Sequence, residues 1–190
     1  MHIMNYSVNC ILLKTYMKKI IIIIITLLTM SIEAQNSLYN ISINSIDNEP
    51  IELSNFKGKF ILFVNVASYC GYTNQYSDLQ KLHETYDNLE VIGLPCNQFL
   101  FQEPFSEDTI KQFCSSNYGV NFIMTEKINV KGKNQHEIYK WLTDKDLNKI
   151  KDSKVKWNFQ KYLVNKSGEL IDVFYSKTLP LSKEITQHLD

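Results

Sequence analysis

The stretch Phe60-Ile-Leu-Phe-Val-Asn-Val-Ala-Ser-Tyr-Cys-Gly-Tyr-Thr73 decides the fold. Its first seven residues form a nearly continuous apolar run, which is typical of a strand that is covered on both faces in a parallel sheet. Small residues then allow a tight exit from the sheet. Beyond them, Tyr76, Leu79 and Leu82 recur at the spacing of one helical face. We therefore expect Cys70 between the end of a buried strand and the start of a helix.

This position suits a reactive thiol. Open α/β sheets carry their chemistry at the carboxyl ends of the strands. A thiol near a helix N-terminus also faces unpaired N–H groups and the positive end of the helix dipole, which favour the nucleophilic thiolate. The alternative interpretation of Cys70 is a small buried hydrophobic residue.

Composition limits the functions to consider. The chain has 190 residues, of which 44% are hydrophobic and 21% charged, and its 20 basic residues balance 20 acidic ones. This balance predicts no nucleic-acid partner and no attraction to an anionic membrane surface. Every basic residue is Lys. Any anionic ligand would have to be held by lysines or backbone N–H groups, because the bidentate clamp of Arg is missing.

The N-terminus has the pattern of an export signal. After Met17 come two lysines, six consecutive isoleucines and a small residue at Ala34, which together describe a signal peptide. The apolar core is too short to span a bilayer. We predict a leader over 1–34 with its start at Met17, and a single mature domain over 35–190 that is exported, periplasmic or secreted, without stable membrane insertion. The competing interpretation is a retained N-terminal anchor.

Cysteine spacing argues against a metal site. Cys10 falls in the leader, and the other three cysteines, Cys70, Cys96 and Cys114, form no C-x-x-C pair. The histidines show no ligand spacing either, so we expect no metal and no cofactor. We interpret Cys96 as structural because it follows a buried strand directly.

The order of the remaining elements indicates the fold class. A short hairpin precedes the central strand, and a second buried strand, helices and a closing strand pair follow it. This order predicts an α/β, thioredoxin-like fold with a central mixed sheet flanked by helices. Thr73 stands where a thioredoxin has its second cysteine. The expected elements cover 38–43, 50–53, 76–86, 90–94, a helix capped by Ser106, 134–142, 157–165, 169–175 and a last helix within 181–189.

Three motifs resemble the glutathione peroxidase family, in its cysteine-containing, thioredoxin-dependent form. They cover residues 65–73, 95–104 and 156–164. The resemblance implies that Cys70 is the peroxidatic cysteine, that Gln102, Trp157 and Asn158 complete a tetrad with it, and that Cys114 is the resolving cysteine. Taken alone, each of these residues would have an ordinary structural interpretation.

The residue types fit peroxide reduction. The two amides and the indole are neutral hydrogen-bond donors, which can stabilise a thiolate and a departing oxide. Attack on a hydrogen peroxide or organic hydroperoxide substrate would give a sulfenic acid on Cys70, and a second thiol would convert it to a disulfide. A thioredoxin-like protein or glutathione would then reduce the Cys70–Cys114 disulfide.

The chain departs from the family pattern at several positions. Leu100 and Phe101 occupy the site of a usual glycine and its neighbour, and Ile123 replaces a usual proline. The absence of Arg and the short segment 143–154 favour a thioredoxin-like reductant and a monomer. Two alternatives remain. A peroxide sensor that oxidises a partner protein would use the same residues, whereas a thiol–disulfide oxidoreductase would need a second cysteine where Thr73 stands.

Overall fold

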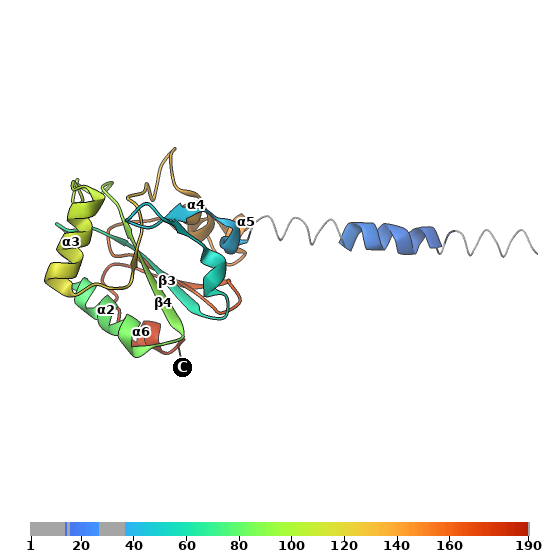
Figure 1. The fold of residues 1–190 in the computed structure, drawn as a ribbon. Helices are drawn as coiled ribbons and strands as arrows, with labels where there is room; N and C mark the ends of the chain where they lie inside the picture. Colours follow the sequence, from blue (N-terminus) through green and yellow to red (C-terminus); the bar gives the residue numbers. More distant parts are fainter. Residues whose placement is uncertain (1–13, 15, 27–36, 190) are drawn as a thin grey trace, which may run out of the picture. The chain divides into compact units, whose positions relative to one another are not determined.

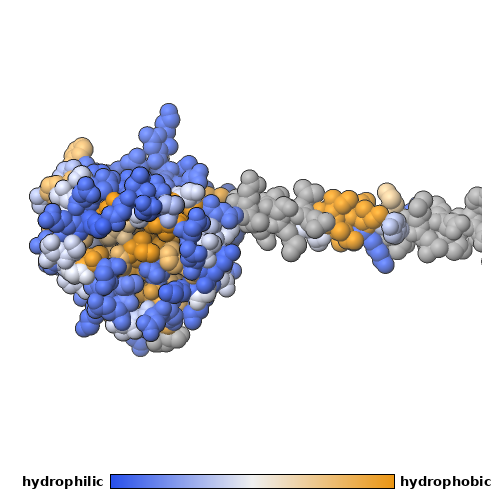
Figure 2. All heavy atoms as spheres, viewed as in Figure 1, coloured by the Kyte–Doolittle hydropathy of each residue, from blue (hydrophilic) through white to orange (hydrophobic). Residues whose placement is uncertain are grey.

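The computed structural model describes residues 14, 16–26 and 37–189, and it divides into the units Met1–Ser37 and Leu38–Asp190. In the first unit the described residues 14 and 16–26 are helical, and the isoleucines 21–25 are exposed and form a hydrophobic band (Figure 2). No helix among the described residues is long and apolar enough to cross a membrane. Cys10 and the predicted cleavage point after Ala34 lie outside the described residues.

The second unit is built on a five-stranded mixed sheet (Figure 1). Its order is β5-β4-β3-β6-β7, with β3 and β4 at the centre and both completely buried. β3 runs parallel to β4, and β4 parallel to β5, whereas β6 and β7 are antiparallel to their neighbours. The prediction of a central mixed sheet is confirmed. The strands are β3 (Phe60–Val66), β4 (Leu89–Pro95), β5 (Ile123–Met124), β6 (Lys161–Val164) and β7 (Leu170–Phe174).

Helices cover both faces of this sheet (Figure 1). One apolar cluster joins the sheet to α2 (Gln75–Thr85), α3 (Glu107–Tyr118) and α6 (Lys183–Thr186). A second cluster lies with α4 (Glu137–Thr143), next to α5 (Lys145–Asn148), and with the two 3₁₀ turns Leu38–Asn40 and Leu53–Phe56. Burial of these faces, and not helix propensity, supplies most of the stability of such short helices. On the face that Figure 2 shows, polar residues surround a central hydrophobic area.

The ends of α3 follow simple capping chemistry. The Ser106 side chain accepts a hydrogen bond from the backbone N–H of Thr109, as the sequence predicts, and two acidic residues stand in the first turn. Gly119 ends the helix in the left-handed conformation, with φ of 63°. The helix that carries Cys114 therefore has defined ends.

Several predicted boundaries were wrong. The strand predicted over 157–165 begins only at Lys161, because residues 157–159 form a turn in which Phe159 has a φ of 61°. The hairpin predicted over 38–43 and 50–53 is shorter, with strands β1 (Ile43–Asn44) and β2 (Pro50–Ile51). The helix predicted over 134–142 starts only at Glu137, and His136 caps it. The short α5 was not predicted.

β5 was also missed, because two residues carry too little periodicity to be recognised. It is held by pairing with β4, in which Gly93 lies opposite Met124. A Cβ atom on Gly93 would stand 2.6 Å from the Met124 sulfur. A side chain at position 93 would therefore have to displace the Met124 side chain, which packs over this glycine.

Candidate active site

Cys70 lies in a turn between β3 and α2, and α2 itself begins five residues later at Gln75. Its backbone N–H donates to Thr73 Oγ1 over 3.0 Å, and its carbonyl accepts from the Thr73 backbone N–H, also over 3.0 Å. Thr73, which stands where a thioredoxin has its second cysteine, thus stabilises the turn through these two hydrogen bonds. The Cys70 thiol is free, and 8% of the residue is exposed.

Two of the predicted donors contact each other directly. Asn158 Nδ2 donates to Gln102 Oε1 over 3.0 Å, although the residues are 56 positions apart. Gln102 is tied to the Cys70 turn as well, because its carbonyl accepts from the Tyr69 backbone N–H over 3.0 Å. Asn158 is fully buried, and its Oδ1 has no hydrogen-bond partner among the described residues.

The backbone of Trp157 is hydrogen-bonded to Asn65 of β3. Its carbonyl accepts from Asn65 Nδ2 over 3.0 Å, and the backbone N–H of Phe159 donates to the Asn65 carbonyl. These two bonds to Asn65 turn residues 157–159 away from a strand path. The indole packs on Phe99, with 5.5 Å between ring centroids, and is half-buried. The position of Trp157 therefore depends on contacts with residues far away in the sequence.

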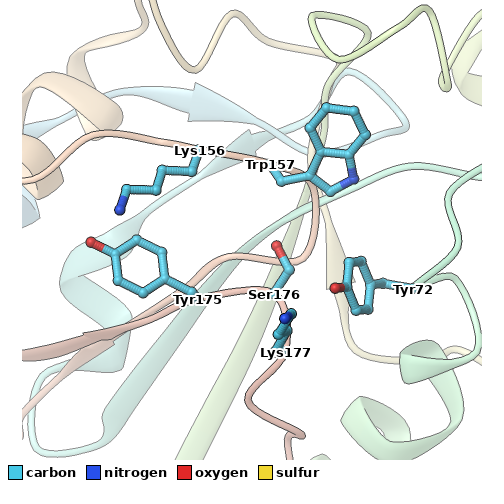
Figure 3. A pocket seen from close by; sticks show the side chains of 6 residues that line it. All are labelled: Tyr72, Lys156, Trp157, Tyr175, Ser176 and Lys177. Atoms are coloured by element: carbon cyan, nitrogen blue, oxygen red, sulfur yellow. The ribbon is translucent and has the colours of Figure 1, made fainter.

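A pocket of about 400 Å³ opens beside Trp157 (Figure 3). The Tyr72 ring comes from the Cys70 turn and faces the same space as the indole, while the Lys156 ammonium lies 4.4 Å from the centre of the Tyr175 ring. A pocket lined by aromatic rings and lysine ammonium groups can accept a ligand that has an apolar body and a negative charge. Of its lining, the sequence analysis singled out only Trp157; the others are Tyr72, Lys156, Tyr175, Ser176 and Lys177.

Cys114 lies on α3 and is only 1% exposed. Burial raises the pKa of the Cys114 thiol to about 11, and the Tyr76 hydroxyl that faces it partly offsets the effect. The thiol is therefore protonated at neutral pH. Cys70 and Cys114 belong to the same apolar cluster and both are free thiols. Cys96 is buried too, and burial raises its pKa, while its sulfur accepts from the Gln98 backbone N–H.

The sequence analysis missed two buried charged residues. Glu103 and Lys161 are both fully buried; burial raises the pKa of Glu103 to about 7 and lowers the pKa of Lys161 to about 7. Lys161 Nζ donates to Gln75 Oε1 and to the carbonyls of Phe159 and Thr178. A charged residue at the start of a strand whose other residues, 162–164, are apolar is the signal that could have identified Lys161.

The loop before Gln102 carries two exposed apolar side chains. Leu100 and Phe101 are 75% and 80% exposed, and both have positive φ, 52° and 53°. Left-handed backbone costs a residue with a side chain about 1–2 kcal/mol. Where the family resemblance implies a glycine, this chain has a larger residue but keeps the backbone conformation that glycine adopts most easily. The two side chains therefore stand in solvent, next to the Gln102 side of the site.

Within the described part of the chain, no group of three or more His, Cys, Asp or Glu side chains could hold a metal ion.

Comparison with known proteins identifies close relatives. The profile of the family "Glutathione peroxidase" matches residues 38–143. The chain is 40% identical over 150 residues to glutathione peroxidase homolog BsaA of Bacillus subtilis, covering 78% of this chain and 94% of that protein. It is also 40% identical over 160 residues to hydroperoxy fatty acid reductase gpx1 of Synechocystis, covering 80% and 94%.

Solved structures agree with this result. The crystal structure of Trgpx in its apo form superimposes with a TM-score of 0.62 and 32% identity, over 80% of this chain and 95% of that one. A thiol:disulfide interchange protein of the thioredoxin family from Chlorobium tepidum gives a TM-score of 0.58 at 14% identity, over 78% and 92%. The second likeness concerns the fold alone, and it confirms the predicted thioredoxin-like architecture.

Proposed function

Because this chain belongs to the glutathione peroxidase family, we propose that Cys70 is the thiol with which it reduces peroxides. The chain is a thiol peroxidase, an oxidoreductase of thioredoxin-like fold. The observation that carries the assignment is the Asn158–Gln102 hydrogen bond, which brings two predicted donors together beside the Cys70 turn.

The proposed reaction begins with attack by the Cys70 thiolate on a peroxide oxygen. The O–O bond breaks, Cys70 becomes a sulfenic acid, and the departing oxygen takes a proton and leaves as water or an alcohol. Gln102, Trp157 and Asn158 stabilise the charge that develops on that oxygen. The Cys114 thiol then attacks the sulfenic sulfur, which forms a disulfide and releases water.

We expect each donor to speed the oxidation of Cys70. Trp157→Phe, Gln102→Ala and Asn158→Ala should each slow it by about tenfold or more, because a preorganised donor to a developing oxyanion contributes roughly 3–4 kcal/mol in favourable cases. Stopped-flow measurement of Cys70 oxidation by hydrogen peroxide checks this. Lys133→Ala, at an exposed lysine outside the pocket lining and the donor set, serves as the control. Unchanged oxidation rates in all three donor variants would contradict the assignment.

A protein reductant is favoured over glutathione. The chain has no Arg to hold the carboxylates of glutathione, and two relatives are named glutathione peroxidase-like peroxiredoxins. We propose a thioredoxin-like partner and a monomeric enzyme, since the segment 143–154 is short and holds only the end of α4 and the four-residue α5. Thr73 argues against the alternative of a thiol–disulfide oxidoreductase, because it removes the second cysteine of that motif.

We also propose that the enzyme works outside the cytoplasm. The support is the lysine pair, isoleucine run and small residue within 17–34. Cells that express the full chain should yield a mature protein that begins near Gln35, and intact mass spectrometry of the exported fraction checks this. Replacing two of the central isoleucines by lysine should retain the protein in the cytoplasm. A purified protein that keeps residues 17–34 would instead point to an N-terminal anchor.

A further inference from the structure

The Glu103 carboxyl is completely buried and joins two loops of the site. Its Oε2 accepts from the Ser68 backbone N–H over 2.9 Å and from Ser68 Oγ over 3.1 Å. Its other oxygen, Oε1, has no hydrogen-bond partner among the described residues. A buried polar atom without a partner costs stability, so packing alone does not account for a carboxyl group at this position.

The connection runs through the catalytic residues. Ser68 stands two residues before Cys70, and Glu103 directly follows Gln102. Together with the bond from Tyr69 N–H to the Gln102 carbonyl, the two Ser68 bonds make three links between the Cys70 turn and the Gln102 loop. Displacement of reacting groups by about 1 Å can cost a factor of 10² in rate. These links therefore bear directly on the alignment of Cys70 with Gln102.

The charge state of Glu103 decides how strong two of these links are. An ionised carboxylate accepts two charge-assisted hydrogen bonds, whereas a protonated carboxyl is a weaker acceptor. Its proton would have to sit on Oε1, which has no hydrogen-bond partner in the described part of the chain. The groups that face Glu103 are Lys127, Cys96 at the end of β4, Cys114 on α3 and Tyr76 on α2. Only Lys127 carries a positive charge.

These surroundings bring the titration into the physiological range. Burial raises the pKa of Glu103 from 4.5 to about 7, while the Ser68 bonds and Lys127 oppose the rise. Because the folded pKa lies above the unfolded one, the stability that the protonated carboxyl contributes is present below about pH 4.5 and is lost as pH rises through about 7. The ionised carboxylate therefore lowers the free energy of unfolding, as expected for a group retained for function.

We propose that Glu103 is a positioning residue of the peroxidase reaction: its ionised carboxylate holds the Ser68–Cys70 turn against Gln102, and Cys70 reacts fastest in that state. The proposal rests on the proposed function of Cys70. It adds a pH-dependent rate that is separate from the ionisation of the Cys70 thiol. Glu103 acts through Ser68 and does not itself touch the peroxide.

The test compares wild type with Glu103→Gln, which keeps the shape of the protonated acid. Stopped-flow rates of Cys70 oxidation by hydrogen peroxide are measured across the pH range and divided by the thiolate fraction, obtained from thiolate absorbance in a background lacking Cys96 and Cys114. The normalised wild-type rate should rise through about pH 7, and the variant should lose that rise. The variant should be slower by about tenfold at high pH and nearly equal to wild type at low pH.

Three further measurements separate positioning from a general structural defect. At high pH Glu103→Gln should melt no lower than wild type, since it removes a buried charge. Ser68→Ala should give a smaller loss of rate, and in combination with Glu103→Gln should add nothing. Asp108→Asn, which removes an exposed carboxylate nearby, should keep the wild-type profile.

Two results would overturn the proposal while the wild type remains an active peroxidase: a normalised rate in Glu103→Gln that matches wild type at every pH, or a loss of equal size at every pH. If Glu103→Gln fails to fold, the proposal is tested by the pH profile of the normalised wild-type rate and by the rate of Ser68→Ala. A flat normalised wild-type rate, or an unaltered rate in Ser68→Ala, would then reject the proposal. Absence of peroxide consumption by the wild type would instead reject the proposed function itself.

Discussion

Cys70→Ser is expected to abolish peroxide consumption and to leave the fold intact. A serine hydroxyl is almost the same size as a thiol, but it does not ionise near neutral pH and is a far weaker nucleophile toward peroxide oxygen. Cys70 lies in a turn whose shape is held by Thr73, so the change in the free energy of unfolding should stay within about 1 kcal/mol. Steady-state peroxide consumption and thermal unfolding measure the two effects.

Cys96→Ala is the matched control for this prediction. Cys96 is also buried and also follows a central strand, but its sulfur is hydrogen-bonded to Gln98, and Cys96 does not belong to the proposed donor set. The control should lose some stability through the small cavity and keep its peroxidase activity. Measurable turnover of Cys70→Ser above the uncatalysed background would mean that another thiol reacts with peroxide.

Cys114→Ser is expected to remove most thioredoxin-dependent turnover, by at least about tenfold, while Cys70 is still oxidised once. In wild type, one equivalent of peroxide should give a Cys70–Cys114 disulfide. A disulfide needs its two Cα atoms within about 7 Å. Cys114 lies on the buried face of α3, where its thiol has a pKa raised to about 11 and is protonated at neutral pH. We therefore expect α3 to open at least partly before the disulfide forms.

The sequence of α3 makes such an opening inexpensive. Ser115, Ser116 and Asn117 are weak helix formers, and only Ile110 and Cys114 of this helix are fully buried. Local opening should therefore cost much less than global unfolding. Exposure would also let the Cys114 thiol ionise, because burial is the main cause of its raised pKa. The opened disulfide would be accessible to a thioredoxin-like reductant.

Peptide mapping of the oxidised protein without reductant identifies the linked cysteines, and far-ultraviolet circular dichroism of the same samples should show a loss of helix. Peroxide consumption is then compared with a thioredoxin system and with glutathione as reductant. A Cys70–Cys96 link, or full thioredoxin-dependent turnover in Cys114→Ser, would contradict this mechanism. Such a result would describe an enzyme with one reactive cysteine that is resolved by an external thiol.

Sequence patterns alone determined the parts of this protein that depend on local order. The apolar run at 60–66 matches β3 in both bounds, and the Ser106 cap starts α3 where the sequence predicts it. Strand burial and helix capping are read from neighbouring residues, so a sequence carries this information directly. The position of Cys70 in the turn after β3 follows from the same local pattern.

Only the tertiary structure decided how the site is assembled. The turn at 157–159, the Asn158–Gln102 bond and the burial of Glu103 against Ser68 all join residues that are 35 to 92 positions apart. In the sequence, Glu103 is an acidic residue in a loop between two prolines, where exposure is the usual expectation. Its burial, and the pKa of about 7 that burial produces, depend on the loops that fold over it, and no local pattern records which loops those are.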